Sequence, residues 1–236
     1  MRAACDLHIH SALSPCAGDE MTPNNIVGMA ALKGLDFIAV TDHNAADNLP
    51  AVEKLCARHK IGFIPGMEVQ TREEVHVLCY FRSVEDALLI AEKIRRGLPD
   101  IQMRPELFGS QLVLDEEDRL VGAVEKMLIQ SSHWSIEELY AQVTALGGAV
   151  VPAHINRGAF SLLYMLGFLP ESPKFAALEI VRGLPVTAPI PENTLILHSS
   201  DAHSLGAILE QEFFLDLQEK SSEALLSRLK GETLSG

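Results

Sequence analysis

Histidine and acidic residues recur along the chain in short groups, the first being Asp6-Leu7-His8-Ile9-His10. The residues before it are mostly apolar, so the group is predicted to end a short buried strand. Because side chains alternate between the two faces of a strand, His8 and His10 lie on the same side, about 7 Å apart along the chain. Two such imidazoles could hold one metal ion. A single pair of this kind also occurs as two incidental polar residues, so the later groups decide its meaning.

Five later groups place further imidazoles or carboxylates within or after predicted strands. They are Thr41-Asp42-His43, Gly66-Met67-Glu68, His76, His154-Ile155-Asn156-Arg157 and Ser200-Asp201-Ala202-His203. Any one of them could be a buried polar residue that has a structural hydrogen-bond partner. Together they favour a metal site, because imidazole nitrogen and carboxylate oxygen suit Zn²⁺, Mn²⁺ or Fe²⁺. The donors exceed the roughly four to six that one ion uses, which predicts two or three ions sharing a bridging carboxylate.

Short apolar strands that alternate with helices are predicted to position these groups. The expected strands are residues 3–8, 36–41, 61–65, 75–81, 149–153, 178–181, 194–199 and 213–217. The expected helices are residues 22–34, 48–59, 84–96, 135–146 and 222–229. Thr22-Pro23 and the capping box Ser135-x-x-Glu138 mark two helix starts. This alternation predicts an α/β protein with a covered parallel sheet or a barrel, in which the C-terminal strand ends converge.

Length and composition narrow the class of protein. The 236 residues are 47% hydrophobic and 22% charged, which predicts one globular domain over residues 1–236. No apolar segment approaches the roughly 20 residues of a membrane span, and the N-terminus has no signal-peptide core. The four cysteines show no Cys-x-x-Cys spacing and are expected to be reduced thiols in a cytoplasmic protein. The net charge of −13 disfavours an extended nucleic-acid surface.

The ordered segments DLHIH, TDHN, GMEVQT, VHVL, PAHINR and SSDAH resemble the PHP (polymerase and histidinol phosphatase) domain family of metal-dependent phosphoesterases, over nearly the whole chain. The resemblance implies a distorted, TIM-like (β/α)7 barrel with its metal site at the C-terminal ends of the strands. It also implies a trinuclear site, with His8, His10, Glu68 and Asp201 on the first ion, Glu68, His76 and His154 on the second, and His43 and His203 on the third.

The chain departs from the family pattern shortly after the first histidine pair. Many members have a histidine or aspartate five or six residues later, where this chain has Pro15-Cys16. Cys16 could bind the third ion as a thiolate, or the carboxylate of Asp19 or Glu20 could take its place. Two or three divalent ions are therefore expected, and Zn, Mn and Fe all suit the ligands.

The expected reaction is hydrolysis of a phosphate mono- or diester by a metal-activated hydroxide, without a covalent intermediate. Two close ions can lower the pKa of a bridging water toward neutrality and neutralise phosphoryl oxygens. Glu68 and Asp201 are the expected catalytic carboxylates. Arg157 is the candidate for direct substrate contact, because a guanidinium matches phosphate oxygens bidentately. The alternative for Arg157 is a pair with a surface acid.

The substrate is expected to be a small phosphorylated compound or a nucleotide, with Phe160 and Tyr164 as candidate pocket residues. The alternatives are a histidinol-phosphatase-like monoesterase and a non-catalytic PHP module that serves interactions. The sequence predicts no oligomeric state.

Three features each have two interpretations. Asp6 and Asp42 precede ligand histidines and could orient them or cap strand ends. His198 could be a hydrogen-bonded core residue or could support the site. Residues 98–122, with a predicted hairpin in LVLDEEDRLVG, could be a solvated insertion or a lid over the substrate.

Overall fold

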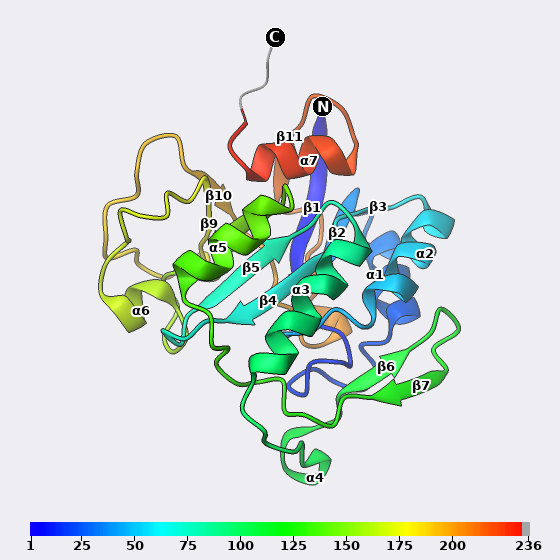
Figure 1. Cartoon of the computed structure of the whole chain (residues 1–236). Coiled ribbons are helices and arrows are strands. Elements are labelled where there is room, and N and C mark those ends of the chain that lie inside the picture. Colours follow the sequence, from blue (N-terminus) through cyan, green and yellow to red (C-terminus); the bar gives the residue numbers. More distant parts are fainter. Residues whose placement is uncertain (233–236) are drawn as a thin grey trace.

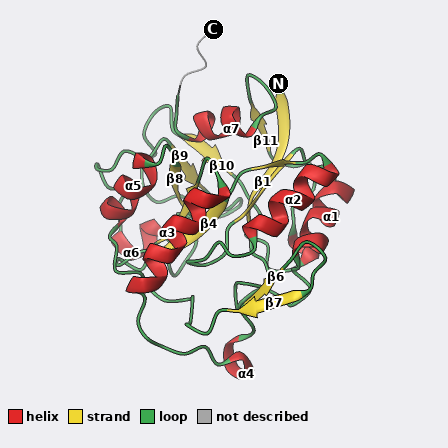
Figure 2. Ribbon diagram, turned by 45° about the vertical axis from the view of Figure 1, so that its right-hand side comes forward, coloured by secondary structure: helices red, strands yellow, loops and turns green. Residues whose placement is uncertain are grey.

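The computed structural model describes residues 1–232, in which short strands alternate with helices (Figures 1 and 2). The strands are β1 (Arg2–Ile9), β2 (Phe37–Val40), β3 (Gly62–Phe63), β4 (Gly66–Gln70), β5 (His76–Tyr80), β6 (Leu112–Leu114), β7 (Leu120–Ala123), β8 (Ala149–Pro152), β9 (Ala177–Glu179), β10 (Leu195–Leu197) and β11 (Phe214–Asp216). The helices are α1 (Pro23–Leu32), α2 (Leu49–His59), α3 (Val84–Gly97), α4 (Pro105–Phe108), α5 (Ile136–Ala145), α6 (Leu162–Leu166) and α7 (Ser222–Leu229), with one 3₁₀ turn at Leu205–Ala207.

The strands pair in four sheets, whose orders are β11-β1-β2-β3, β4-β5-β8, β10-β9 and β6-β7. Pairing is parallel for β1–β2, β2–β3 and β9–β10, whereas β11 runs antiparallel to β1, and β5 runs antiparallel to both β4 and β8. Residues 1–232 thus form a mixed α/β fold, and the predicted closed barrel is not confirmed. The parallel expectation is wrong for β11 and for β5, and at β5 the short link from β4 allows a hairpin but no crossover.

Backbone hydrogen bonds connect strand ends that belong to different sheets. The N–H of Glu68 donates to Thr41 at 3.2 Å, and the N–H of Ile155 donates to Glu179 at 2.9 Å. The N–H of His10 donates to the carbonyl of Ala202 at 2.9 Å. Segments that are distant in sequence are therefore fixed beside one another at one end of the strands, which is where the predicted ligands lie.

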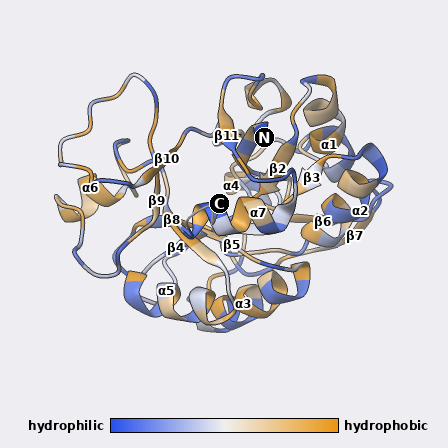
Figure 3. Ribbon diagram, turned by 90° about the horizontal axis from the view of Figure 1, so that it is seen from above, coloured by the Kyte–Doolittle hydropathy of each residue, from blue (hydrophilic) through white to orange (hydrophobic). Residues whose placement is uncertain are grey.

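The helices pack their apolar faces on the sheets, and their caps follow the sequence. The buried residues of α3 recur every three or four positions (Val84, Ala87, Ile90, Ala91 and Ile94), as expected of an amphipathic helix. Figure 3 shows the matching hydrophilic and hydrophobic bands on α3 and α5. The Thr22 side chain caps α1, and the predicted capping box of Ser135 and Glu138 is formed at α5. No helix in the described part of the chain is both long and apolar enough to cross a membrane.

The predicted hairpin in the insertion is confirmed as the antiparallel pair β6–β7, which projects beside α1 and α2 (Figure 1). The N–H of Leu112 donates to the carbonyl of Ala12 at 2.8 Å, and the hydroxyl of Thr22 donates to Asp118 at 2.7 Å. The insertion is thereby attached to the segment that follows the first histidine pair.

Candidate metal centre

The eight predicted ligands converge on one cluster, although they come from six segments of the chain. Six of them are buried: His8, His10, His43, Glu68, His76 and His154. Asp201 and His203 are partly buried at its edge. Imidazole ring centroids lie 4.3 Å apart for His10 and His203, and 5.1 Å apart for His43 and His76. His76 reaches the cluster from the start of β5, because that strand runs antiparallel to β4.

Glu68 lies at the middle of the cluster, with only 1% of its side chain exposed. Its Oε2 is 2.9 Å from His43 Nδ1, and its Oε1 is 3.1 Å from His76 Nδ1 and 3.2 Å from His154 Nε2. Both oxygens also lie 3.4 Å from the nearer nitrogens of the first histidine pair. The sequence had suggested that Glu68 follows the end of a strand. In the structure it lies within β4. One carboxylate therefore contacts five imidazoles, which suits a bridging role.

The donor atoms fall into three overlapping groups, in each of which all atoms lie within 4.8 Å of one another. The groups are His8, His10 and Asp201; His43, Glu68 and His76; and His10, His43 and His203. The first two groups resemble the predicted first and second ion sites. The resemblance placed His43 on the third ion, whereas here it also contacts Glu68, which makes it a link between the second and third groups.

The orientation of the imidazoles fits metal ions. His8 Nε2 and His10 Nε2 face each other at 3.1 Å, while each Nδ1 is hydrogen-bonded on the outer side. Two nitrogen lone pairs at this distance repel unless a proton or a cation lies between them. His76 Nδ1 makes no hydrogen bond within the described residues although Glu68 Oε1 is 3.1 Å away, and His154 faces the same oxygen with its Nε2 at 3.2 Å. Imidazole nitrogens that face carboxylate oxygens in this way are the donor set that divalent transition ions prefer.

The pKa shifts within the cluster also favour bound cations. Burial lowers the pKa of His8, but the nearby carboxylates, Glu179 foremost, raise it well above its usual value. Burial and the charge on His43 lower the pKa of His10 to about 3. Burial raises the pKa of Glu68, but its histidine neighbours bring it well below its usual value. The buried carboxylates thus need positive charge beside them, which bound divalent cations would supply.

Glu179 and Ser14 are supporting residues that the sequence reasoning missed. The carboxylate of Glu179, at the end of β9, accepts hydrogen bonds from His8 Nδ1 and from the N–H of His154, both at 2.9 Å. Ser14 Oγ lies 2.9 Å from His10 Nδ1. Glu179 could have been recognised from the sequence, because it is an acidic residue within a predicted apolar strand. The sequence carries no comparable signal for Ser14.

Asp42 and Asp6 take different roles. Asp42 accepts the hydroxyl proton of Ser14 at 2.6 Å, so it orients His10 through that serine. Asp6 instead accepts the backbone N–H groups of Ser200 at 3.0 Å and Leu209 at 2.9 Å. It therefore positions the segment that carries Asp201 and makes no hydrogen bond with a histidine ring.

Two ligand candidates have backbone angles that are rare for residues with a side chain. His154 has φ of +31° and Asp201 has φ of +52°. Such conformations cost of order 1–3 kcal/mol and persist where the surrounding structure imposes them, often at functional sites. Both side chains point into the cluster from strained turns after β8 and β10.

The residues predicted to contact substrate lie at the edge of the cluster. Arg157 is 44% exposed and pairs with the carboxylate of Asp201. Phe160 stacks on His76 with ring centroids 5.0 Å apart and planes within 7°, and it stays 40% exposed. Tyr164 is 69% exposed. His198 Nδ1 lies 2.7 Å from the carbonyl of Ile180, which agrees with its interpretation as a hydrogen-bonded structural residue.

Cys16 lies against the third group of donors. Partial burial raises the pKa of its thiol, but hydrogen bonds from His203 and His43 lower it to about 7. Asp19 and Glu20, the two other candidates for this position, are exposed. Neither carboxylate makes a hydrogen bond or ion pair with the cluster within residues 1–232.

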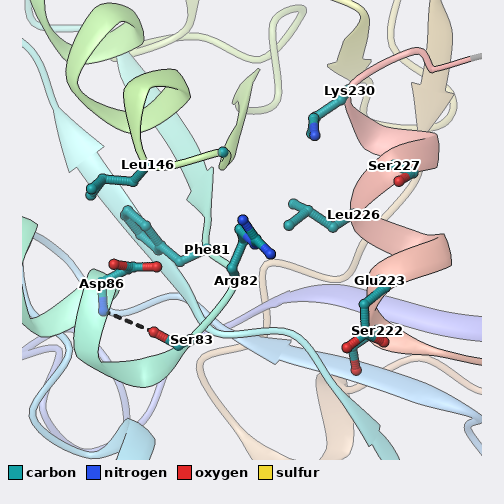
Figure 4. Close-up of a pocket in the computed structure, with 11 residues that line it drawn as sticks. Phe81, Arg82, Ser83, Asp86, Leu146, Ser222, Glu223, Leu226, Ser227 and Lys230 are labelled. Atoms are coloured by element: carbon teal, nitrogen blue, oxygen red, sulfur yellow. Dashed lines mark hydrogen bonds between the residues drawn. The ribbon is translucent and has the colours of Figure 1, made fainter.

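A separate cavity of about 780 Å³ lies at the other end of β5, between α3 and α7 (Figure 4). Arg82 and Lys230 extend into it, and none of the eight predicted ligands lines it. The predicted metal ligands therefore gather in the cluster and not in this cavity.

Comparison with known proteins gives matches in sequence and in fold. The PHP domain family model matches residues 6–149. A 3′,5′-nucleoside bisphosphate phosphatase from Chromobacterium violaceum is 34% identical over 79 residues, which are 32% of this chain and 27% of that protein.

Among solved structures, the lesion-specific endonuclease Q from Pyrococcus furiosus matches with a TM-score of 0.66 and 22% identity, over 99% of this chain and 57% of that one. A candidate metal-dependent phosphoesterase from Bifidobacterium adolescentis matches with a TM-score of 0.60 and 20% identity, over 94% of this chain and 95% of that one. This chain therefore spans about a quarter of the phosphatase and about half of the endonuclease, and the two solved structures establish similarity of fold. Since the family model covers more than half of the chain, the protein belongs to the PHP domain family.

Proposed function

We propose that the protein is a metal-dependent phosphoric ester hydrolase that acts on a small phosphorylated compound, with a nucleotide as the favoured class. The observation that carries this proposal is the contact of one buried carboxylate, Glu68, with five imidazoles that come from four other segments. A structural role alone would not require so many buried imidazoles around one carboxylate.

Two or three divalent ions, of Zn, Mn or Fe, are the proposed cofactors. His8, His10, Glu68 and Asp201 would hold the first, Glu68, His76 and His154 the second, and His43 and His203 the third. When bound, the ions would act as Lewis acids that lower the pKa of water and neutralise phosphoryl oxygens. The chain itself would keep the ligand nitrogens unprotonated through Glu179 and Ser14, which accept the Nδ1 protons on the outer side.

Arg157 is the proposed phosphate contact. Its guanidinium lies at the rim of the cluster, where Asp201 holds it in place. Because the residue is 44% exposed, it can turn toward an incoming phosphate without leaving a buried charge. A guanidinium supplies two parallel donors to phosphate oxygens, which would orient the ester against the centre.

The exposed ring of Phe160 supports a nucleotide over histidinol phosphate. It forms a flat apolar surface against a ligand histidine, and bases stack on such rings. The similarity to a nucleoside bisphosphate phosphatase agrees with this choice. The fold similarity to an endonuclease makes a nucleic acid the second candidate, but the net charge of −13 disfavours a long one.

The test is to load the purified protein with Mn²⁺, Zn²⁺ or Fe²⁺, measure bound metal by elemental analysis, and assay p-nitrophenyl phosphate and bis(p-nitrophenyl) phosphate. Hydrolysis that requires metal is the expected result. A mononucleotide, a 3′,5′-bisphosphate nucleotide, a short RNA, an abasic DNA duplex and histidinol phosphate would then be compared by kcat/KM. Absence of both bound metal and hydrolysis would instead support a non-catalytic PHP module.

A further inference from the structure

One buried amide joins the hairpin β6–β7 to the segment that follows the first histidine pair. Asn48 directly precedes α2 and is fully buried, but its side chain makes no capping hydrogen bond to that helix within residues 1–232. Instead, its Nδ2 donates to the carbonyl of Leu112 at 3.1 Å, and its Oδ1 accepts the N–H of Leu114 at 2.9 Å. Nδ2 also donates to the hydroxyl of Ser11 at 2.9 Å. The amide therefore holds β6 on one side and Ser11 on the other.

From Ser11 the hydrogen bonds continue to the metal cluster. Asp42 accepts the N–H of Ser11 at 2.7 Å and the hydroxyl groups of Ser11 and Ser14, both at 2.6 Å. A hydroxyl has one hydrogen, so the Ser14 oxygen can only accept from its other neighbours. These are the His10 ring, at 2.9 Å from Nδ1, and the backbone N–H of His43, at 3.2 Å. His10 therefore carries its proton on Nδ1, which leaves Nε2 free for an ion.

The same reasoning fixes the type of residue at position 48. Because the hydroxyl of Ser11 donates to Asp42, its oxygen must accept a hydrogen bond from Asn48. An aspartate at position 48 would place an oxygen, with no hydrogen to donate, against the carbonyl of Leu112. Its negative charge would also draw the Ser11 hydroxyl away from Asp42. The network thus needs the amide as a donor, and an isosteric acid would oppose it.

We propose that Asn48 is a positioning residue of the metal centre, which acts on His10 through the two serines and the aspartate between them. The inference rests on the proposed metal-dependent function and extends it to the insertion. The hairpin β6–β7, which lies beside α2 (Figure 1), is then part of the support of the centre and neither a solvated appendage nor a lid. A second contact agrees with this role, because the N–H of Leu112 donates to the carbonyl of Ala12 at 2.8 Å.

A second buried amide in the same region provides a matched control. Gln111 is 2% exposed, and its Nε2 donates to the carbonyls of Val124 and Lys126 at 2.6 and 2.9 Å. Its Oε1 accepts the N–H of Leu128 at 2.9 Å. These three partners lie in the segment that returns from the hairpin, away from the serines and Asp42. Gln111→Glu therefore disturbs the insertion as Asn48→Asp does, but it leaves the link to His10 in place.

The experiment measures metal binding and does not depend on activity. Zn²⁺ and Co²⁺ would be titrated calorimetrically into the metal-free wild type, N48D, Q111E and Ser11→Ala, after circular dichroism has verified that each is folded. N48D and S11A should weaken the ions by at least about tenfold, the lower end of the cost of losing an outer partner of a ligand histidine. Q111E should bind them like the wild type. The visible spectrum of bound Co²⁺, which depends on ligand geometry, should change in N48D and S11A and not in Q111E.

The variant S11A keeps the test decisive if N48D does not fold, because it breaks the same link without altering the contacts of the hairpin. If N48D or S11A binds metal as tightly as the wild type, the positioning role is wrong and the phosphoesterase proposal stands. If Q111E weakens the ions as much as N48D does, loosening of the insertion explains the effect and the role of Asn48 is again wrong. If only N48D and S11A weaken the ions but no protein hydrolyses bis(p-nitrophenyl) phosphate, the positioning role is supported and the enzymatic proposal fails.

Discussion

Glu179 Oε2 accepts hydrogen bonds from His8 Nδ1 and from the backbone N–H of His154, both at 2.9 Å. A single carboxylate at the end of β9 therefore orients one proposed ligand on β1 and another after β8. Its side chain is only 3% exposed, and burial raises its pKa while the charge on His8 brings the pKa below its usual value. It accordingly remains ionised and fixes the proton of His8 on the outer nitrogen.

The first prediction is that Glu179→Gln lowers metal affinity and activity by about 10–100-fold, the usual cost of losing an outer partner of a ligand histidine. The uncharged amide is a weaker acceptor for the His8 Nδ1 proton, and its NH2 group would replace the carboxylate oxygen that lies 3.2 Å from that nitrogen. The tautomer with the proton on Nδ1, which leaves Nε2 free for the ion, therefore loses its preference. Metal titration and kcat/KM would measure the effect. Glu212→Gln, at an exposed acid that lines the same small pocket as Glu179, is the matched control and should stay near wild type. Unchanged metal binding in E179Q would contradict the assigned role.

The second prediction concerns the bridging carboxylate. Glu68→Gln should reduce activity more than His43→Ala, because Glu68 contacts five imidazoles and is proposed to join two ions. Elemental analysis should show that E68Q retains fewer ions than H43A. Equal losses, or a smaller loss in E68Q, would count against the bridge.

The third prediction is a loss of stability on chelation. Bound ions would stabilise the buried carboxylates and the imidazole nitrogens that face them, so a chelator should lower Tm and added metal should restore it. An ion at about 100 times its Kd stabilises by about 2.7 kcal/mol, and for a chain of this size each kcal/mol shifts Tm by about 2–4 °C. A shift of roughly 5–10 °C is therefore expected in differential scanning calorimetry. A Tm that does not respond to metal would show that the cluster is satisfied by its own hydrogen bonds.

The fourth prediction tests the aromatic surface at the rim. Phe160→Ala should raise KM for a nucleotide, since stacking of one base contributes about 1–3 kcal/mol. Hydrolysis of bis(p-nitrophenyl) phosphate gives a readout of the centre itself and should change little. Phe168→Ala, which removes another exposed aromatic ring, is the control. If F160A affects both substrates alike, the ring supports His76 and does not bind a base.

The sequence predicted that the eight candidate ligands lie together, and it predicted most helices, because both depend on local signals. Apolar periodicity and capping residues such as Thr22 and Ser135 mark helices whatever the topology. The family prediction is confirmed, but the prediction of parallel strands was wrong at β11, which pairs antiparallel with β1, and at β5, where the orientation depends on the length of the turn before His76. Ser14 could not be predicted, because its role depends on how residues 11–21 fold and a single serine forms no sequence motif.

The last prediction separates two roles of Arg157, which pairs with Asp201 in the structure. If the guanidinium binds the substrate phosphate, Arg157→Lys keeps a positive charge but loses the bidentate geometry, so KM for phosphate esters should rise while bound metal is unchanged. If Arg157 only orients Asp201, R157K should weaken the first ion and lower kcat at saturating substrate. Elemental analysis alongside the kinetics distinguishes the two results. Arg182→Lys, at a second exposed arginine of the same rim, is the control and should leave both quantities near wild type. We expect the KM effect, because an arginine that is 44% exposed contributes little as a structural ion pair and is free to meet an incoming phosphate.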